Sequence, residues 1–399
     1  MNLVGTLGYS EYSRSFNENI IEEAIKNEFK TDFDGKNKSV IYEALFTDKK
    51  ADKFNYQIGL RSGYNYNRTI SKYSSIQEED NSRFDLYPYL SVNGKLGNLA
   101  YMIGTGMKYL RNENTYISKE YIKNTSNVSF FYQTNKGINL QYIFLYAPSY
   151  PQISSLSNIE QSIDENIRMT GNPYINPFGT IRNTFNITYR PKNHISSVLS
   201  LSHSYLDRPI RDIISDEHDY FLIKPQNINN EYSFGAKLET SISSIITNFD
   251  FKIGLGWNSY HSKIKNIAHK LDDFYWSAVI NYYNKNFAAS FGWKEPEKIL
   301  AGEQIYQGEN NSYINAMYNY KRLAFAVGVY FPFTRWSQYY SWRVSPMALT
   351  DRKVYIKDNS YMFFVGVSYN FNWGKSLFNL SRNRNNTSTD NSFIKVNDN

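Results

Sequence analysis

The sequence predicts an all-β protein, a transmembrane antiparallel β-barrel of about sixteen strands. Three observations predict it. Large apolar side chains alternate with small or polar ones along many segments, aromatic residues make up 17% of the 399 residues, and short and long connections alternate along the chain. Period-two alternation indicates a strand whose two faces meet different surroundings. A soluble propeller also repeats its strands, but propeller strands are shorter and do not sort their loops by length.

The clearest strand covers residues 361–373. Its odd positions, from Tyr361 to Trp373, are all large and apolar, whereas its even positions become small and polar. A tilted strand crosses a bilayer in about 9 to 11 residues, so this segment is long enough. Aromatic side chains stand at both ends of its apolar face, where the two membrane interfaces would lie. We interpret it as the last membrane strand.

The same alternation recurs from the N-terminus onward. It marks residues 3–10, 40–46, 54–66, 84–92, 99–109, 128–132, 138–146, 181–190, 195–205, 231–242, 248–258, 274–282, 287–293, 314–320 and 323–331. Lys237, Asp250 and Lys252 share the polar face, whereas Phe251 and Leu255 lie on the opposite one. A lipid-facing charge near mid-bilayer costs about 2 to 4 kcal/mol, so the polar face is predicted to line the lumen.

The connections support the same architecture. Short ones are expected near residues 47–52, 94–97, 135–137, 191–194, 243–245, 284–285 and 321–322. Long polar ones are expected near residues 13–37, 67–82, 111–124, 148–178, 207–230, 259–271, 294–311 and 333–359. Strict alternation of this kind is typical of outer-membrane barrels, with short periplasmic turns and longer outer loops. Asn17 to Phe29, in the first outer connection, suits either a short amphipathic helix or a mobile loop.

Composition excludes several classes of protein. No apolar run approaches the ~18 residues of a membrane helix, and 36 Tyr and 26 Phe suit the aromatic girdles of a barrel. The net charge of +7 includes no basic block, so no nucleic-acid partner is expected. Met1 to Gly5 lacks the features of a secretory signal. The chain is therefore expected to be mature or part of something longer, with a barrel over 1–373, no plug domain, and a disordered periplasmic tail over 374–399.

Two segments carry family resemblances. Gly366, Tyr369 and Phe371 resemble the C-terminal insertion signal of bacterial outer-membrane proteins, although Val365 stands where a polar residue is usual. The alternative is a glycine that lets a lumenal neighbour pack closely. In the longest outer connection, one run resembles the Gly-Asn-Pro-x-Leu-x-Pro segment of TonB-dependent receptors, with Ile175 in place of Leu: Gly171, Asn172, Pro173, Asn176 and Pro177.

Two further segments are similar to the same family. Its C-terminal close is matched by Asn370, Phe371, Trp373, Gly374 and Lys375, and Ser290 to Pro296 is a weaker likeness. The resemblance implies an outer-membrane barrel that imports a scarce nutrient, such as a glycan, peptide or siderophore, with energy transmitted by TonB. It implies outer-membrane lipid, the barrel-assembly machinery and the imported ligand as partners, and leaves a surface lipoprotein open. TonB would act only through a plug that this chain lacks, and no cofactor is expected.

Two alternatives to the receptor remain open. The family barrel has twenty-two strands, so the chain is either the C-terminal part of such a barrel, with or without activity of its own, or a plug-less relative. A passive porin of about sixteen strands is the second possibility. Genomic sequence upstream of Met1 would separate them. A first strand without an upstream partner must pair with residues 361–373, because lipid cannot satisfy an open edge.

Enzyme signals are weak. The five histidines share no spacing, and no nucleophile elbow, phosphate loop or dinucleotide motif is present. Asp216, Glu217, His218 and Asp219 carry groups that bind divalent metals, but a solvated hairpin explains them as well. Barrel proteases and lipases place catalytic groups at the outer rim, so the Asp/His pairs between His203 and Asp219 leave that class open. We expect no enzyme and no metal site.

Overall fold

The computed structural model describes residues 2–22, 25–51, 54–72, 76–114, 117–134, 136–158, 160–162, 166–192, 194–243, 245–333, 337–345, 349–356, 361–369 and 371. Nearly all of them form strands, and α1 (Ile153–Leu156) is a single helical turn. Within these ranges no helix is long and apolar enough to cross a membrane. The predicted tail, 374–399, lies outside the described residues.

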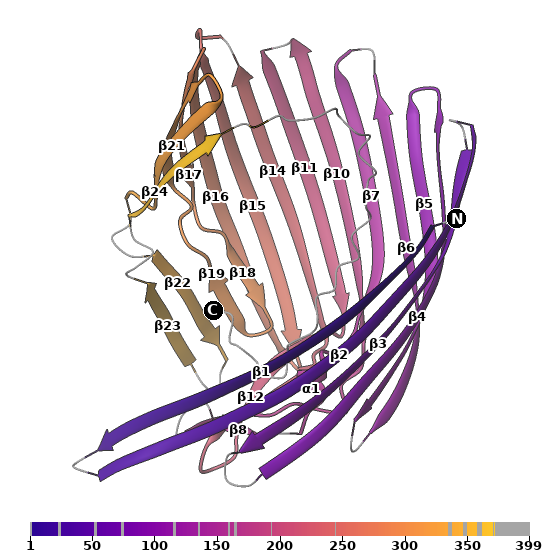
Figure 1. Ribbon diagram of the computed structural model, residues 1–399, viewed down its shortest axis with the longest axis vertical. Helices are drawn as coiled ribbons and strands as arrows, with labels where there is room; N and C mark the ends of the chain where they lie inside the picture. Colours follow the sequence, from indigo (N-terminus) through magenta and orange to yellow (C-terminus); the bar gives the residue numbers. More distant parts are fainter. Residues whose placement is uncertain are drawn as a thin grey trace.

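One antiparallel sheet contains sixteen strands, which confirms the predicted fold class and strand number. Its strands, in sheet order, are β1 (Asn2–Glu22), β2 (Ile25–Ala51), β3 (Phe54–Lys72), β4 (Ile76–Leu96), β5 (Leu99–Asn114), β6 (Ser118–Gln133), β7 (Ile138–Ser149), β10 (Phe178–Lys192), β11 (Ile195–Asp207), β14 (Asn230–Ser243), β15 (Phe249–Ile264), β16 (Ile267–Asn284), β17 (Phe287–Lys294), β20 (Tyr313–Tyr320), β21 (Leu323–Tyr330) and β24 (Met362–Tyr369). Figure 1 shows them as a tilted, curved wall.

The sheet is open within the described residues. β1 pairs only with β2, and β24 pairs only with β21. Direct pairing between the first and last strands, expected for a self-contained barrel, is therefore not formed there. An open edge leaves backbone amides and carbonyls that lipid cannot satisfy, so both edge strands need partners in a membrane.

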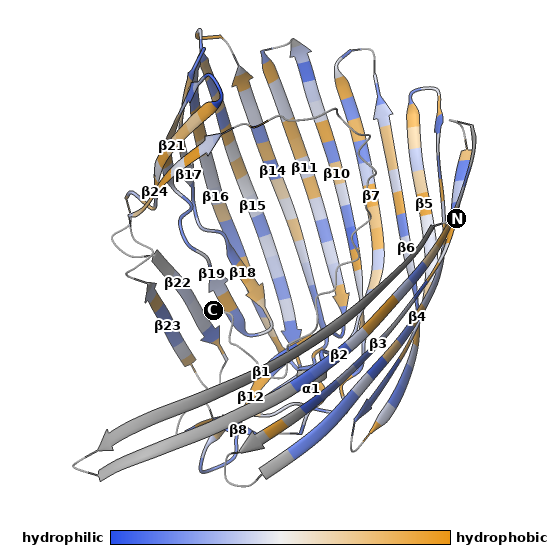
Figure 2. Ribbon diagram, viewed as in Figure 1, coloured by the Kyte–Doolittle hydropathy of each residue, from blue (hydrophilic) through white to orange (hydrophobic). Residues whose placement is uncertain are grey.

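The two faces of the wall follow the predicted alternation. Lys237 and Lys252 both contact Glu239, with Nζ to Oε1 distances of 3.3 and 3.2 Å, so the three charges share one face. Ile253 and Leu255 are exposed on the other face. Figure 2 shows the same stripes of hydrophilic and hydrophobic residues along the strands. The charged face lines the lumen, because these charges cannot face lipid.

Aromatic side chains gather on the outward face near the short turns. All of them are exposed: Phe46, Phe54, Tyr132, Tyr189, Phe287, Tyr318, Tyr320 and Tyr369. Their place, next to the turns that join neighbouring wall strands, is that of a girdle at one membrane interface. The predicted girdle is confirmed at this end of the wall.

Glycines on the lumenal face accommodate tyrosine rings from the neighbouring strand. Gly59 pairs with Tyr89 and Gly256 pairs with Tyr275 in the ladder. A Cβ at either glycine would lie 2.1 Å from a ring carbon of that tyrosine. Glycine is required at both positions because the ring occupies the space of the missing side chain.

Four of the predicted long connections are wrong. The ladder continues to Glu22–Ile25 between β1 and β2, and to Ile264–Ile267 between β15 and β16. Residues 13–37, 67–82, 111–124 and 259–271 are thus mostly strand, and Asn17 to Phe29 forms neither a helix nor a loop where it is described. A strand that leaves the membrane meets water on both faces, so it can be polar throughout and still keep its hydrogen-bond ladder.

The other long connections fold into two smaller sheets. The first consists of β12 (Ile210–Asp216), β13 (Phe221–Asn227), β9 (Ile167–Met169) and β8 (Gln161–Ser162). The second consists of β18 (Lys298–Ala301), β19 (Gln304–Gln307), β22 (Ser337–Val344) and β23 (Leu349–Ile356). Both lie toward one end of the wall, away from the short turns (Figure 1). We call them the first and second outer sheets.

Candidate functional site

A cavity lies between the wall and the outer sheets, with a volume of about 400 Å³. We call it the vestibule cavity. Its polar lining includes residues from the segment after β7, the first outer sheet and the second outer sheet: Tyr150, Gln152, Arg211, Asp212, Gln304 and Tyr306. A volume of this size is in the usual range of small-molecule sites, about 300 to 1,000 Å³.

Glu231 holds one side of the cavity in place. Arg211 Nε donates to Glu231 Oε1 at 2.9 Å, and a second guanidinium nitrogen contacts Oε2. The Gly302 amide and the Ser262 hydroxyl also donate to Oε1. With only 6% of its surface exposed, Glu231 joins two wall strands and both outer sheets at one point. The charge of Arg211 is therefore compensated beneath the cavity.

A second group of ionisable side chains lies near the lining residues Asp212 and Tyr306. Arg343 is 8% exposed, and burial lowers its pKa, while Asp212, Glu303 and Tyr306 oppose that shift. His269 Nε2 lies 4.0 Å from the Glu303 carboxylate. Arg211 and Asp212, which line the cavity, thus have groups of opposite charge close by.

Two tyrosines give the cavity hydrogen-bond donors. Burial raises the pKa of Tyr150 to about 12 and also raises the pKa of Tyr306. Both hydroxyls therefore stay protonated at neutral pH. Together with the amides of Gln152 and Gln304, they offer donors, acceptors and aromatic faces to a polar ligand.

Glu79 lies on the part of β4 that extends past the membrane. It holds the segment that follows β7 against the wall. It is 1% exposed, the Ser157 hydroxyl donates to it, and Asn114 Nδ2 donates to Oε1 at 3.2 Å. Burial raises the pKa of Glu79, against the Ser157 hydrogen bond. Residues 148–158 are thereby held to the wall.

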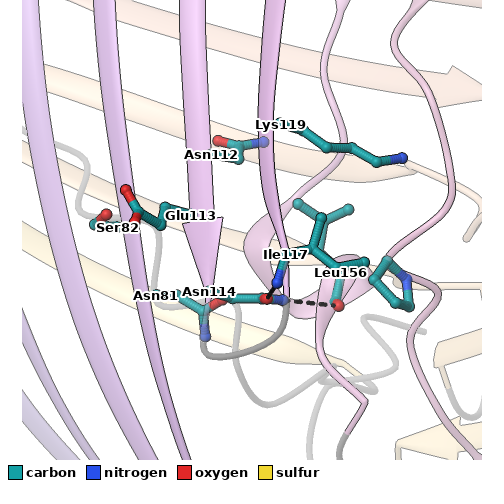
Figure 3. Close-up of a pocket in the computed structure, with 9 residues that line it drawn as sticks. Asn81, Ser82, Asn112, Glu113, Asn114, Ile117, Lys119 and Leu156 are labelled. Atoms are coloured by element: carbon teal, nitrogen blue, oxygen red, sulfur yellow. Dashed lines mark hydrogen bonds between the residues drawn. The ribbon is translucent and has the colours of Figure 1, made fainter.

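Figure 3 shows a small hollow lined by Asn81, Asn114 and Leu156, among other residues. Asn114 accepts a hydrogen bond from the Ile117 amide at 2.7 Å and donates to the Leu156 carbonyl at 3.5 Å. The hollow there has a volume of about 10 Å³ and is bordered by Pro173. It has room for about one water molecule, so it is a junction between elements and not a ligand site.

The predicted Gly-Asn-Pro segment forms hydrogen bonds to two other parts of the outer connections. Asn172 Nδ2 donates to the Pro225 carbonyl at 2.9 Å, and the Asn172 amide donates to the Ser155 carbonyl at 2.7 Å. The Asn176 amide donates to Asn227 Oδ1 at 2.8 Å. Gly171, Pro173 and Pro177 are buried. The segment joins the start of β10 to α1 and β13, and none of its five motif residues lines the vestibule cavity.

The predicted insertion signal lies on β24 and just after it. Tyr369 and Phe371 are exposed, the latter by 68%. A Cβ at Gly366 would lie 3.8 Å from Ala326 Cβ, an ordinary contact. Close packing therefore does not explain this glycine, and the insertion signal stays a prediction. Asn370, Trp373, Gly374 and Lys375 lie outside the described residues.

The acidic run is a hairpin turn. The His218 amide donates to Asp216 Oδ1 at 2.9 Å, and His218 has a φ of 74°. Within the described ranges, no group of three His, Cys, Asp or Glu side chains is placed to hold a metal ion. His203 stacks on Phe234, a wall residue exposed on the outward face, with ring centroids 4.8 Å apart.

Sequence reasoning missed the residues that build the vestibule cavity. Arg211 and Glu231 are 20 residues apart, and Gly302 is 71 residues from Glu231. Residues on different connections between barrel strands have no characteristic sequence separation that would show that they meet. The one available signal was Glu231 itself, a carboxylate at the outer end of a lumenal face.

No family model matches the sequence, and no curated protein matches it. Solved structures do resemble the fold. The copper transporter OprC gives a TM-score of 0.67 at 10% identity, over 92% of this chain and 62% of that one. BauA, the ferric preacinetobactin receptor of Acinetobacter baumannii, gives 0.57 at 10% identity, over 92% and 60%. The siderophore receptor PirA of Pseudomonas aeruginosa gives 0.55 at 9% identity, over 82% and 61%.

These structures are TonB-dependent outer-membrane receptors, the family that the sequence motifs resemble. The chain therefore has the fold of the barrel wall of such receptors. It spans about three fifths of the length of these neighbours, 62% in the case of OprC.

Proposed function

We propose that the protein is the wall of an outer-membrane receptor that binds a ligand in the vestibule cavity and passes it into the lumen. The observation that carries the proposal is a polar cavity of about 400 Å³ between the wall and two outer sheets, on a fold shared with transporters of copper and iron. Outer-membrane lipid and the barrel-assembly machinery are the partners that this placement requires. Coupling to TonB would need a plug domain, and the proposal includes no catalytic step.

The lining favours a ligand rich in hydrogen-bonding groups. Arg211 is compensated by Glu231, and the tyrosine hydroxyls stay protonated. Tyr150 and Tyr306 provide flat apolar faces beside these donors. This combination suits a glycan or a peptide, in which polar groups alternate with apolar faces.

The test is a binding screen on the full chain in detergent. Oligosaccharides, oligopeptides and ferric siderophores are added separately, and binding is read from thermal stability and tryptophan fluorescence. We expect one class to bind, and Tyr306→Ala to weaken binding at least tenfold, the loss expected for a buried contact of about 1.5 kcal/mol. Tyr174→Ala is the matched control, because Tyr174 is 74% exposed and lies outside the cavity. Binding that Tyr306→Ala leaves unchanged would contradict the proposal.

The same preparation tests the porin alternative. A passive channel conducts steadily in a planar bilayer and retains no ligand. Steady conductance together with no retained ligand from any of the three classes would overturn the receptor proposal in favour of the channel.

A further inference from the structure

We propose a second binding site, for an oxyanion, on the lumenal face of the wall between β14 and β21. A cavity of about 320 Å³ lies there, separate from the vestibule cavity. Its charged lining consists of Lys237, Glu239, Lys252 and Lys294, and Tyr275 and Tyr313 are among its aromatic residues. We call it the wall cavity.

The charges of the wall cavity do not balance. Lys237 Nζ and Lys252 Nζ lie 3.3 and 3.2 Å from the same oxygen, Glu239 Oε1. One carboxylate thus serves two ammonium groups, which leaves one positive charge without a counterion in the group. The third lysine, Lys294, has its own partner in Glu297 at 2.9 Å.

The two ammonium groups also keep N–H donors that an oxyanion could accept. Each ammonium group has three N–H donors, and Glu239 occupies one donor of each. Because both ammonium groups contact the same oxygen, they converge from neighbouring strands, with Lys237 on β14 and Lys252 on β15. An oxyanion that accepts from both would complete an alternating square of two positive and two negative groups.

The wall itself makes room for a ligand. Tyr275 lies against Gly256, and Tyr313 lies against Gly292, where an added Cβ would be 2.1 and 2.2 Å from a ring carbon. Both rings are therefore pressed onto the sheet, and the two glycines add no side chain to the lumen. A phosphate or carboxylate group fills only part of 320 Å³. The site therefore fits an oxyanion carried by a small diffusible molecule.

The experiment measures binding of two probes to the full chain in detergent by calorimetry. Inorganic phosphate tests a tetrahedral oxyanion, and succinate tests a carboxylate. We expect saturable binding of at least one probe. Lys252→Gln and Lys237→Gln should each weaken it about tenfold or more, the usual loss for a hydrogen bond between charged groups.

Glu239→Gln gives the decisive result. It removes the carboxylate that competes for both ammonium groups, so binding should strengthen about threefold to tenfold. A purely structural ion pair predicts the opposite, because loss of Glu239 would loosen both lysines. Lys123→Gln is the control, since Lys123 shares the lumenal face of β6 but lies outside the wall cavity.

Three outcomes would overturn the proposal: no saturable binding of either probe, equal losses in Lys252→Gln and Lys123→Gln, or weaker binding in Glu239→Gln. None of them bears on the vestibule cavity, whose test uses other probes and other variants. The two proposals can therefore fail independently.

Discussion

Two buried carboxylates, Glu231 and Glu79, are stabilised in different ways. Glu231 accepts from a guanidinium, a backbone amide and a hydroxyl. Glu79 accepts from Ser157 and Asn114, which are both neutral. A buried charge that is paired and hydrogen-bonded can remain ionised, whereas one with only neutral donors shifts toward its protonated form. The two residues are therefore expected to respond differently to mutation.

Replacing Glu231 should loosen both outer sheets where they meet the wall. Glu231→Ala leaves Arg211 without its counterion and removes the acceptor of the Gly302 amide. Breaking a buried pair of this kind costs about 3 to 5 kcal/mol. We expect trypsin to cleave residues 207–230 and 295–311 much faster, with the wall strands still resistant. Glu217→Ala is the control, because Glu217 is exposed at the β12–β13 turn. Equal cleavage of both variants would contradict the role assigned to Glu231.

Acidification should tighten the contact around Glu79. Burial raises the pKa of Glu79 above its ordinary value of 4.5, so the folded state binds the proton more tightly than the unfolded chain does. The added stability is fully present below about pH 4.5 and is lost as pH rises through the folded-state pKa. Hydrogen exchange of residues 155–158 should therefore slow as pH is lowered from neutral, after correction for intrinsic rates.

Glu79→Gln separates this titration from other acid effects. The amide is neutral at every pH, so the variant should show strong protection already at neutral pH and little further change on acidification. Glu113→Gln is the control, because Glu113 pairs with Arg111 on the exposed part of β5. An unchanged pH profile in Glu79→Gln would show that another group titrates.

At the scale of single elements, the alternation of the wall strands was predictable and their ends were not. Lys252 and Leu255 lie on the faces that period two assigns to them, because lipid and water select opposite side chains. The ion pair between Arg68 on β3 and Glu78 on β4 was not predicted, because residues 67–82 were expected to form a long connection. Outside the membrane both faces meet water, so a polar strand and a polar loop have the same composition.

The candidate site was less predictable than the wall. β9 pairs in parallel with β13, and Ile223 is the partner of Met169 more than 50 residues away. Such pairings depend on how separate outer connections pack against each other, and no local sequence pattern predicts that packing. The Gly-Asn-Pro segment was identified from sequence, but its contacts with Pro225 and Asn227 belong to the assembled fold.

Cysteine labelling along β15 tests the two faces directly. The chain contains no cysteine, so single substitutions have no background. We expect Asp250→Cys and Lys252→Cys to react with a water-soluble maleimide in intact membranes, whereas Phe251→Cys and Leu255→Cys react only after detergent is added. Labelling of all four positions at similar rates would contradict a lipid-facing surface on this strand.

Two glycine substitutions separate packing from membrane insertion. In Gly256→Ala the new Cβ meets the Tyr275 ring, and displacing a packed ring costs about 1 to 3 kcal/mol. Gly366→Ala meets only Ala326 at an ordinary distance. We expect a lower melting temperature for Gly256→Ala alone. If Gly366 belongs to an insertion signal, its variant should assemble more slowly into membranes and then melt normally.

Across the whole molecule, Glu79 and Glu231 are two of the points that fix the outer sheets and their connections to the wall. Glu79 holds residues 148–158, and Glu231 holds β12 and the turn between β18 and β19. The pairing of β9 with β13 joins these anchors through one sheet. The vestibule cavity lies within this assembly, so its shape depends on both anchors at once.

This arrangement predicts coupling between the anchors. In Glu79→Ala or Glu231→Ala alone, the remaining anchor still holds the first outer sheet through β9 and β13, so each variant should lose only part of the outer protection. The double variant should expose more of the outer sheets than either single variant does, and it should lose more than the sum of the single losses, by about 0.5 to 3 kcal/mol. Protection is measured by hydrogen exchange over residues 148–178 and 207–230, and the heat-modifiable band on gels reports whether the wall stays folded. Losses that simply add would mean that the two anchors hold separate units, and the vestibule cavity would then need only one of them.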